Sequence, residues 1–148
     1  MATEQRSAGA IIFYIENKEP YFLLLKYPTY WGFPKGRIEK SKNETEEQAA
    51  KREIKEETGF SVSFIPDFKE KQKWYYTAKE DSKKEIIKKF STYFLAEINK
   101  EEKNKIKISE EHEGYAFVPL KDIRNYIRIK QNYLLLRKAR NFIKKSKS

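Results

Sequence analysis

The sequence predicts a single α/β domain over residues 1–148, with its folded core over about residues 6–145. Three observations lead to this fold class. Apolar, β-branched runs typical of strands lie both before and after a capped central helix, and the chain ends in apolar residues at helical spacing. With 148 residues, 39% hydrophobic and 15% aromatic, the chain is long enough for one domain with a buried core.

The first part of the chain is expected to form a hairpin. Residues 1–7 are polar and are expected to be loose. The apolar runs at 8–15 and 21–26 flank a turn-like segment that contains Pro20, which predicts two paired strands. Residues 27–35 then form a loop that leads into the central helix.

The central helix is marked at both ends. Asn43 and Thr45 are both candidates for its N-cap. Each is followed three residues later by a Glu or Gln, Glu46 and Gln48 respectively, as a capping box requires. Gly59 lies where a left-handed C-cap would end the helix. Small or apolar residues supply its buried side: Ala49, Ala50 and Ile54.

The second half of the chain continues with extended segments. Two short segments, 61–65 and 114–118, and two longer ones, 68–78 and 88–98, are predicted as strands from the same signals. Pro66 and Pro119 end two of them. A charged turn is expected at 79–84 and a charged loop at 99–105.

Helical spacing returns near the end of the chain. Leu120, Ile123 and Ile127 repeat at this spacing, and a second helix is predicted over about residues 131–145. Its inner side is expected to carry Leu135, Leu136, Ala139, Phe142 and Ile143.

The central helix presents three carboxylates on one face, because Glu53, Glu56 and Glu57 stand at offsets 0, +3 and +4. Their mutual repulsion is relieved by a hard divalent cation, and Mg2+ accepts carboxylates together with substrate phosphates. A bare E-x-x-E-E pattern is more often a solvated acidic face. Here, however, the turn from Trp31 to Gly36 places Lys35 and exposed backbone beside the acidic face, which favours a metal–polyphosphate site.

This segment resembles the Nudix box, G-x5-E-x7-R-E-U-x-E-E-x-G-U, where U is apolar. Every named position is filled in order, by Gly36, Glu44, Arg52, Glu53, Ile54, Glu56, Glu57, Gly59 and Phe60. One departure is that seven residues, not five, separate the first two, so we place a two-residue insertion at Lys40 to Lys42. The resemblance implies a mixed β-sheet sandwiched between helices and Mg2+-dependent hydrolysis of a phosphoanhydride, with Mn2+ as a substitute cation.

Further segments are similar to the asymmetric diadenosine tetraphosphate hydrolases, which implies cleavage of diadenosine tetraphosphate to AMP and ATP. The similar segments are residues 6–13, 31–36, 89–96 and 109–113. In that subfamily a Glu directly before a His lies near the metals, which corresponds to Glu111. His112, the single histidine, could carry a proton, but we expect it to fix the loop through a hydrogen bond.

The resemblance also implies roles for individual residues. Glu53, Glu56, Glu57 and Glu111, with the carbonyl of Gly36, are the predicted metal ligands. Glu53, Glu56 or Glu111 could be the general base, and the sequence does not choose between them. Arg52 is expected to pin the helix through a carboxylate such as Glu44, since a guanidinium suits bidentate pairing.

Binding of a nucleotide needs cations and an aromatic platform. Lys35 and Lys89 are the predicted phosphate contacts, and Tyr27, Tyr76 or Tyr93 could stack on a base. Lys89 and Tyr93 are four residues apart, so on a strand their side chains face the same side.

The net charge of +10 favours polyanionic partners, although lysine used for solubility explains it equally well. An RNA 5′-end pyrophosphohydrolase or decapping enzyme is therefore an alternative, and a non-catalytic nucleotide- or RNA-binding module is a weaker one. The chain has no cysteine, no apolar run that could cross a bilayer and no signal-like start, so we expect a cytoplasmic protein with no membrane partner. The sequence leaves the oligomeric state open.

Overall fold

One mixed β-sheet with apolar layers on both faces organises the computed structural model, which describes residues 2–80 and 83–146. Five strands follow the order β3-β2-β1-β6-β5, while β4 pairs with β1 and β7 with β2. β1 and β6 are parallel, and the other pairs are antiparallel. The strands are β1 (Ala2–Glu16), β2 (Glu19–Lys26), β3 (Trp31–Gly32), β4 (Lys35–Arg37), β5 (Glu70–Glu80), β6 (Lys83–Glu97) and β7 (Gly114–Pro119).

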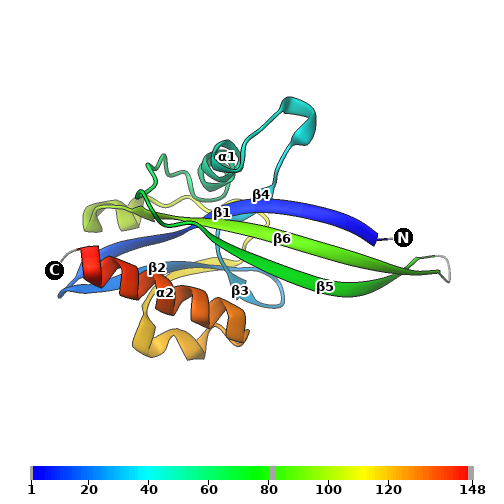
Figure 1. The fold of residues 1–148 in the computed structure, drawn as a ribbon. Helices are drawn as coiled ribbons and strands as arrows, with labels where there is room; N and C mark the ends of the chain where they lie inside the picture. The colour runs from blue at the N-terminus through cyan, green and yellow to red at the C-terminus, as the bar shows by residue number, and fades with distance from the viewer. Residues whose placement is uncertain (1, 81–82, 147–148) are drawn as a thin grey trace.

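Helices cover both faces of the sheet. They are α1 (Glu46–Thr58), α2 (Lys130–Ser146) and the 3-10 helices η1 (Lys40–Lys42), η2 (Lys100–Lys105) and η3 (Leu120–Asn125). Figure 1 shows α1 on one face of the sheet and α2 on the other, with β5, β6 and the start of β1 extending past both helices. The predicted α/β fold, a mixed sheet between helices, is confirmed. No helix among the described residues is long and apolar enough to cross a membrane.

The alternation of side chains along β1 builds the two layers. Ile11 and Phe13 point into the layer that contains the buried residues of α2. Ala10 and Ile12 point into the opposite layer, against Ile54 of α1. The predicted inner residues of α2 are buried, except that Phe142 is partly buried and packs edge-on against Phe68. Because successive side chains of a strand face opposite ways, one apolar strand serves both layers.

The signals at the ends of α1 act as the sequence predicts. Thr45, not Asn43, is the N-cap, and it forms a complete capping box with Gln48. Asn43 instead ends η1 in a left-handed conformation with φ 54°. Gly59 closes the helix at φ 81°, where its N–H donates to the carbonyl of Lys55. The inserted residues thus form a short 3-10 turn before the helix and leave α1 intact.

The prediction that residues 1–7 are loose is wrong for residues 2–7. These residues form the first part of β1 and pair in parallel with β6 from Ala2↔Ile86 onward. Polarity concealed the strand, because this part of the sheet lies beyond the helical layers and needs few apolar residues. Arg6 is held there by the ring of Phe90, 4.6 Å from its guanidinium carbon.

The strand predicted at 61–65 is also wrong. These residues have no regular secondary structure, and Ile65 alone makes a ladder-like bond, donating its N–H to Leu95 at 2.8 Å. The alternation that suggested a strand is real, since Phe60, Val62 and Phe64 pack in the α1-side layer. Apolar packing therefore gave this segment a strand-like pattern without a partner strand.

Two other segments form 3-10 helices, one where a loop was predicted and one where helical spacing was seen. The charged loop expected at 99–105 contains η2, where the side chain of Glu102 accepts a bond from the N–H of Asn99 at 3.2 Å. The helical spacing at 120–127 corresponds to the 3-10 helix η3, in which Ile123 is buried.

An ion pair fixes the end of α2 to the β1–β2 hairpin. Arg140 donates to both carboxylate oxygens of Glu19, at 3.1 and 3.0 Å, and Lys144 lies 2.8 Å from the same carboxylate. The hydrogen bond from Arg140 is the largest cause that lowers the pKa of Glu19 to about 2. This pairing joins two segments that are far apart in the sequence.

We expect Glu19→Gln to lower the free energy of unfolding at neutral pH by less than about 1 kcal/mol, because the pair is partly exposed. The depressed pKa stabilises the fold above the ordinary value of 4.5, and this stabilisation is lost as pH falls toward 2. Urea unfolding of both proteins should therefore show a difference that shrinks below about pH 4.5. Asp122→Asn, which removes an exposed carboxylate from η3, is the control. A difference that is unchanged between pH 7 and 3.5 would contradict the assignment.

Candidate active site

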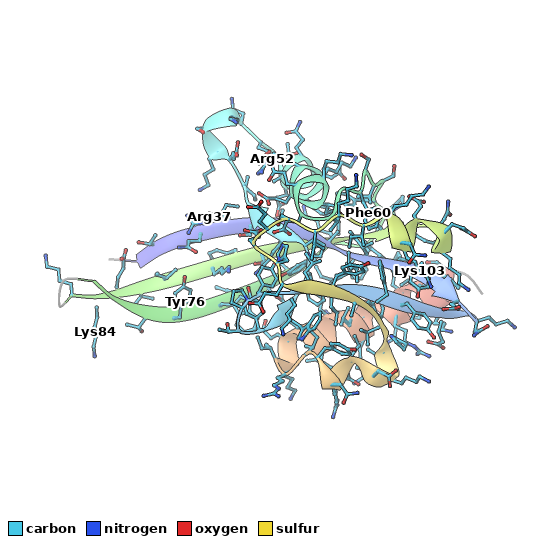
Figure 2. The ribbon with its side chains drawn as sticks, turned by 180° about the vertical axis from the view of Figure 1, so that it is seen from behind. Arg37, Arg52, Phe60, Tyr76, Lys84 and Lys103 are labelled. Atoms are coloured by element: carbon cyan, nitrogen blue, oxygen red, sulfur yellow. The ribbon has the colours of Figure 1, made fainter. Side chains whose placement is uncertain are left out.

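Arg52 connects three parts of the chain at the base of the site. Its Nε and Nη2 donate to the two oxygens of Glu44, at 2.7 and 2.9 Å. Nη2 also donates to the carbonyl of Arg37 at 2.9 Å, and Nη1 donates to Glu53 at 2.7 Å. The guanidinium lowers the pKa of Glu44 to about 2. The expected pairing of Arg52 with Glu44 is present despite the longer loop, and Figure 2 shows Arg52 on α1.

Gly36 brings the β4 backbone against the carboxylate of Glu53. A Cβ atom on Gly36 would lie 1.9 Å from Cδ of Glu53, so no side chain fits there. Burial raises the pKa of Glu53, while the hydrogen bond from Arg52 opposes that shift. The two residues predicted as ligands on different elements are therefore neighbours.

Glu57 is the buried centre of the site, with 3% of its surface exposed. Its Oε2 accepts a bond from the N–H of Lys35 at 2.9 Å. Its Oε1 lies 3.4 Å from Nε2 of His112, which is 3.4 Å from Glu111. Burial, reinforced by Glu111, raises the pKa of Glu57 to about 9. A buried carboxylate beside a second carboxylate needs a compensating cation to remain ionised.

Glu57, Glu111 and His112 offer ligand atoms that all lie within 4.8 Å of one another. Both ring nitrogens of His112 are buried without a hydrogen-bond partner among the described residues. Oxygen-rich groups next to a position that only glycine can occupy suit a hard divalent cation. The residues present therefore fit the metal that the sequence predicts.

The hydrogen bond expected to fix the loop through the His112 side chain is absent from the described residues. The backbone does this instead, since the N–H of His112 donates to the carbonyl of Ser109 at 3.1 Å. The ring packs edge-on against Tyr27, with 4.6 Å between centroids. Burial lowers the pKa of His112, which favours a neutral ring.

The two remaining predicted ligands are more exposed. Glu56 has 58% of its side chain exposed and lies 3.4 Å from Arg52. Glu111 has 62% of its side chain exposed. The structure thus brings Glu57 and Glu111 together, and it holds Glu53 and Glu56 through Arg52.

An open cleft of about 290 Å³ begins beside Lys35. Lys35 and Lys89 both line it, and burial together with the charge of Lys89 lowers the pKa of Lys35 to about 8. Tyr93 and Tyr76 also line it, Tyr93 buried and Tyr76 exposed. The other lining residues are Tyr30, Gly32, Phe33, Gln72, Trp74, Tyr75, Ile129 and Asn132. The cleft combines two amino groups with aromatic walls.

The position of Tyr27 argues against the base platform proposed for it. Its ring is stacked on Tyr30 at 4.7 Å, and its hydroxyl donates to the carbonyl of Phe33 at 2.9 Å. Tyr27 does not line the cleft, and the aromatic side chain that does so at this edge is Tyr30.

Sequence reasoning missed two parts of the cleft. Trp74 lies directly opposite Lys89 in the β5–β6 register, and alternation places it on the same face as Tyr76. This pairing could have been found by aligning the two strands around the charged turn. Gln72 donates to Asn132 of α2 at 2.9 Å, a hydrogen bond between distant segments that no local signal reveals.

The geometry can be compared with known proteins. Residues 3–138 match the NUDIX domain, which is most of the chain. The chain belongs to the NUDIX domain family. As a NUDIX hydrolase it is expected to act on nucleoside polyphosphates with a divalent cation, and its Glu/His cluster agrees with such an ion.

Among relatives, the chain is 29% identical to the asymmetrical bis(5′-nucleosyl)-tetraphosphatase of Mus musculus, over 93% of this chain and 95% of that protein. Its fold is similar to a C. elegans Ap4A hydrolase in a binary complex, with a TM-score of 0.74, 28% identity, and 94% and 97% of the two chains covered. The E. coli dihydroneopterin triphosphate pyrophosphohydrolase has a TM-score of 0.66 at 18% identity, over 92% and 96%, which shows the fold alone.

We expect Gly36→Ala to displace the Glu53 carboxylate, because the new Cβ would occupy its position. Mn2+ binding, followed by electron paramagnetic resonance, should weaken about tenfold or more, the range for groups that orient metal ligands. Gly114→Ala is the matched control, because a Cβ there meets no atom within 4 Å. Equal Mn2+ affinity in the two variants would show that the Gly36–Glu53 approach does not belong to the metal site.

Proposed function

We propose that this NUDIX hydrolase cleaves a phosphoanhydride of a dinucleoside polyphosphate with Mg2+, with diadenosine tetraphosphate giving AMP and ATP. The observation that carries the proposal is the cleft itself, in which Lys35 and Lys89 stand beside aromatic residues and the backbone N–H of Lys35 donates to buried Glu57. The likeness to an Ap4A hydrolase at 28% identity and to an asymmetrical bis(5′-nucleosyl)-tetraphosphatase at 29% identity supports the same substrate class.

The cleft has the parts that a nucleotide needs. Its volume of about 290 Å³ is at the low end for ligand sites and suits one nucleoside unit. Trp74 and Tyr76 offer rings for a base, and base–aromatic stacking contributes about 1–3 kcal/mol. Lys35 and Lys89 offer two ammonium groups to the phosphates that follow. The second nucleoside would lie outside this cleft.

The protein groups divide the work of hydrolysis. Glu53, Glu56, Glu57, Glu111 and the Gly36 carbonyl would hold Mg2+. When bound, the cation neutralises charge on the anhydride and acidifies a water molecule. Lys35 and Lys89 orient the phosphate chain. Arg52 is a positioning residue, because it holds Glu53 and Glu44 and does not line the cleft.

Glu53, Glu56 and Glu111 are the candidates for the general base. Arg52 contacts the first two, at 2.7 and 3.4 Å, which fixes them on α1. Glu111 lies on a different segment, beside His112. The general base is therefore either a carboxylate held on α1, Glu53 or Glu56, or a carboxylate of the loop before β7, Glu111.

We expect Glu57→Gln to lower turnover about a hundredfold or more, because the substitution removes the buried negative charge that the cation requires. The amide oxygen can still accept the bond from Lys35, so the fold should persist. The apo protein should be as stable as the wild type or more so, since carboxylate repulsion falls. Turnover in Mg2+ and urea unfolding are the measurements.

Glu110→Gln is the matched control for this test. It removes an exposed carboxylate from the same acidic loop and should leave turnover within about twofold. Wild-type turnover of the Glu57 variant in Mg2+ would refute the role assigned to Glu57. Unfolding of the variant would be seen directly in the urea titration.

Product analysis tests the reaction itself. Chromatography after incubation with diadenosine tetraphosphate should show AMP and ATP in equal amounts. Lys89→Ala should lower kcat/KM by an amount equivalent to about 1–2 kcal/mol of activation free energy, because it removes a charge-assisted hydrogen bond. Lys88→Ala is the control, since Lys88 does not line the cleft and alternation turns its side chain to the other face of β6.

Two outcomes would reject the proposed substrate. Formation of two ADP molecules would place the attack at the centre of the phosphate chain. Absence of dinucleotide cleavage, with pyrophosphate released from triphosphorylated RNA, would favour the RNA pyrophosphohydrolase. An equal loss of kcat/KM in the Lys88 and Lys89 variants would show that Lys89 makes no specific contact with the phosphates.

A further inference from the structure

A second hollow, of about 530 Å³, lies over η3 and the start of α2. We call it the basic hollow and define it by the residues that line it: Arg124, Ile127, Arg128, Lys130, Tyr133, Leu134 and Arg137. Figure 1 shows α2 on the sheet face opposite α1. Four of the residues that line the hollow are cations, and none of the lining residues, all of which are described, is acidic. The hollow is therefore strongly electropositive.

The cations of the hollow differ from other cations of α2 in having no carboxylate partner among the described residues. Arg140 and Lys144 pair with Glu19, and Lys138 lies 3.5 Å from Glu70. Among residues 3–77 and 83–146, no carboxylate pairs with any of the four cations of the hollow, and Arg124 instead lies 4.5 Å from the ring centre of Tyr133. These three cations of α2 are therefore paired with carboxylates, whereas the hollow keeps its charge.

The choice of cation is also informative. The sequence contains 32 lysines and arginines, of which seven are arginines, and three of those seven line the hollow. Charge used only for solubility would follow the lysine-rich composition of the chain. Arginine provides planar, bidentate recognition of phosphate groups. The concentration of arginine therefore points to a phosphate-bearing partner.

A further cavity lies between the hollow and the cleft. This cavity of about 480 Å³ shares Tyr30, Ile129 and Asn132 with the cleft, and it shares Ile127 and Arg128 with the hollow. Tyr30 and Ile129 are exposed by 43% and 41%, so the connecting wall is apolar and open. A polymer that starts in the cleft can follow this path to the arginines.

We propose that the basic hollow binds single-stranded RNA whose 5′ end points toward the cleft. This inference rests on the proposed hydrolase site only for the direction of the strand. A dinucleotide does not need four further cations, whereas a polymer places one phosphate at each nucleotide. The exposed side chain of Leu134 and the partly buried ring of Tyr133 offer apolar surface to unstacked bases, which single strands present and duplexes do not. An acidic protein would match the charge but not the path to a nucleotide cleft.

The test uses a 12-nucleotide 5′-hydroxyl oligouridylate with a fluorescent 3′ end, in EDTA so that hydrolysis plays no part. Anisotropy measured from 50 to 300 mM NaCl gives the affinity and its salt dependence. The quadruple variant R124Q/R128Q/K130Q/R137Q should bind at least about tenfold more weakly at 100 mM NaCl. For every phosphate that the variant no longer neutralises, the slope of log K against log salt should flatten by about 0.7.

The matched control neutralises the same number of charges elsewhere, in K40Q/K83Q/K84Q/K105Q. It should bind RNA within about threefold of the wild type. Hydrolysis of diadenosine tetraphosphate by the hollow variant should stay within about twofold of wild type, which shows that the cleft is intact.

Three outcomes would overturn the proposal. An equal loss of affinity in both quadruple variants would show that net charge alone attracts RNA. If the wild-type protein does not bind the oligouridylate at 50 mM NaCl, single-stranded RNA is not the partner. Equal or tighter binding of a 12-residue polyglutamate, abolished in the hollow variant, would assign the hollow to acidic proteins. Because EDTA prevents turnover, none of these outcomes bears on the hydrolase proposal.

Discussion

The guanidinium of Arg52 is the constraint on which the site depends. It joins the loop before α1, through Glu44, to β4, through the carbonyl of Arg37, and to the helix face, through Glu53. Without this cation the carboxylates of the helix would repel one another, and the link between α1 and the end of β4 would break. Together with the hydrogen bond from the N–H of Lys35 to Glu57, this side chain holds the backbone of Gly36 against the acidic face. This explains why a two-residue insertion in the loop leaves the site intact.

Burial makes the acidic face a site and not a solvated surface. Glu57 is almost fully buried, and its neighbours are a second carboxylate, a neutral histidine and the backbone N–H of Lys35. Only one of its oxygens accepts a backbone hydrogen bond, and its raised pKa favours the neutral acid when no cation is bound. Such an arrangement is costly in a folded protein unless a cation completes it. The fold thus favours an ionised Glu57 carboxylate only when a cation is bound.

Much of this could be predicted from the sequence, because the decisive signals are local. Thr45 and Gly59 mark α1 by short-range hydrogen bonds, and the carboxylate spacing follows from the helical repeat. The errors arose where the partner of a segment decides its structure, as at residues 2–7, which form a strand because β6 lies beside them. The same distinction explains the cleft, because Trp74 enters it through strand register and Asn132 through the packing of α2 on the sheet. Neither relation is written in a short stretch of sequence.

A basic protein with an acidic centre solves an electrostatic conflict. The carboxylates that would hold a cation repel a polyphosphate, and this repulsion acts before the cation and substrate meet. Lys35 and Lys89 place positive charge at the entrance to the site, and the arginines of the hollow add positive charge beside α2. Fields of this kind raise the encounter rate of charged ligands and weaken with salt. The net charge of +10 is therefore unevenly placed, and the ion pairs at Glu19 and Glu70 decide where it remains available.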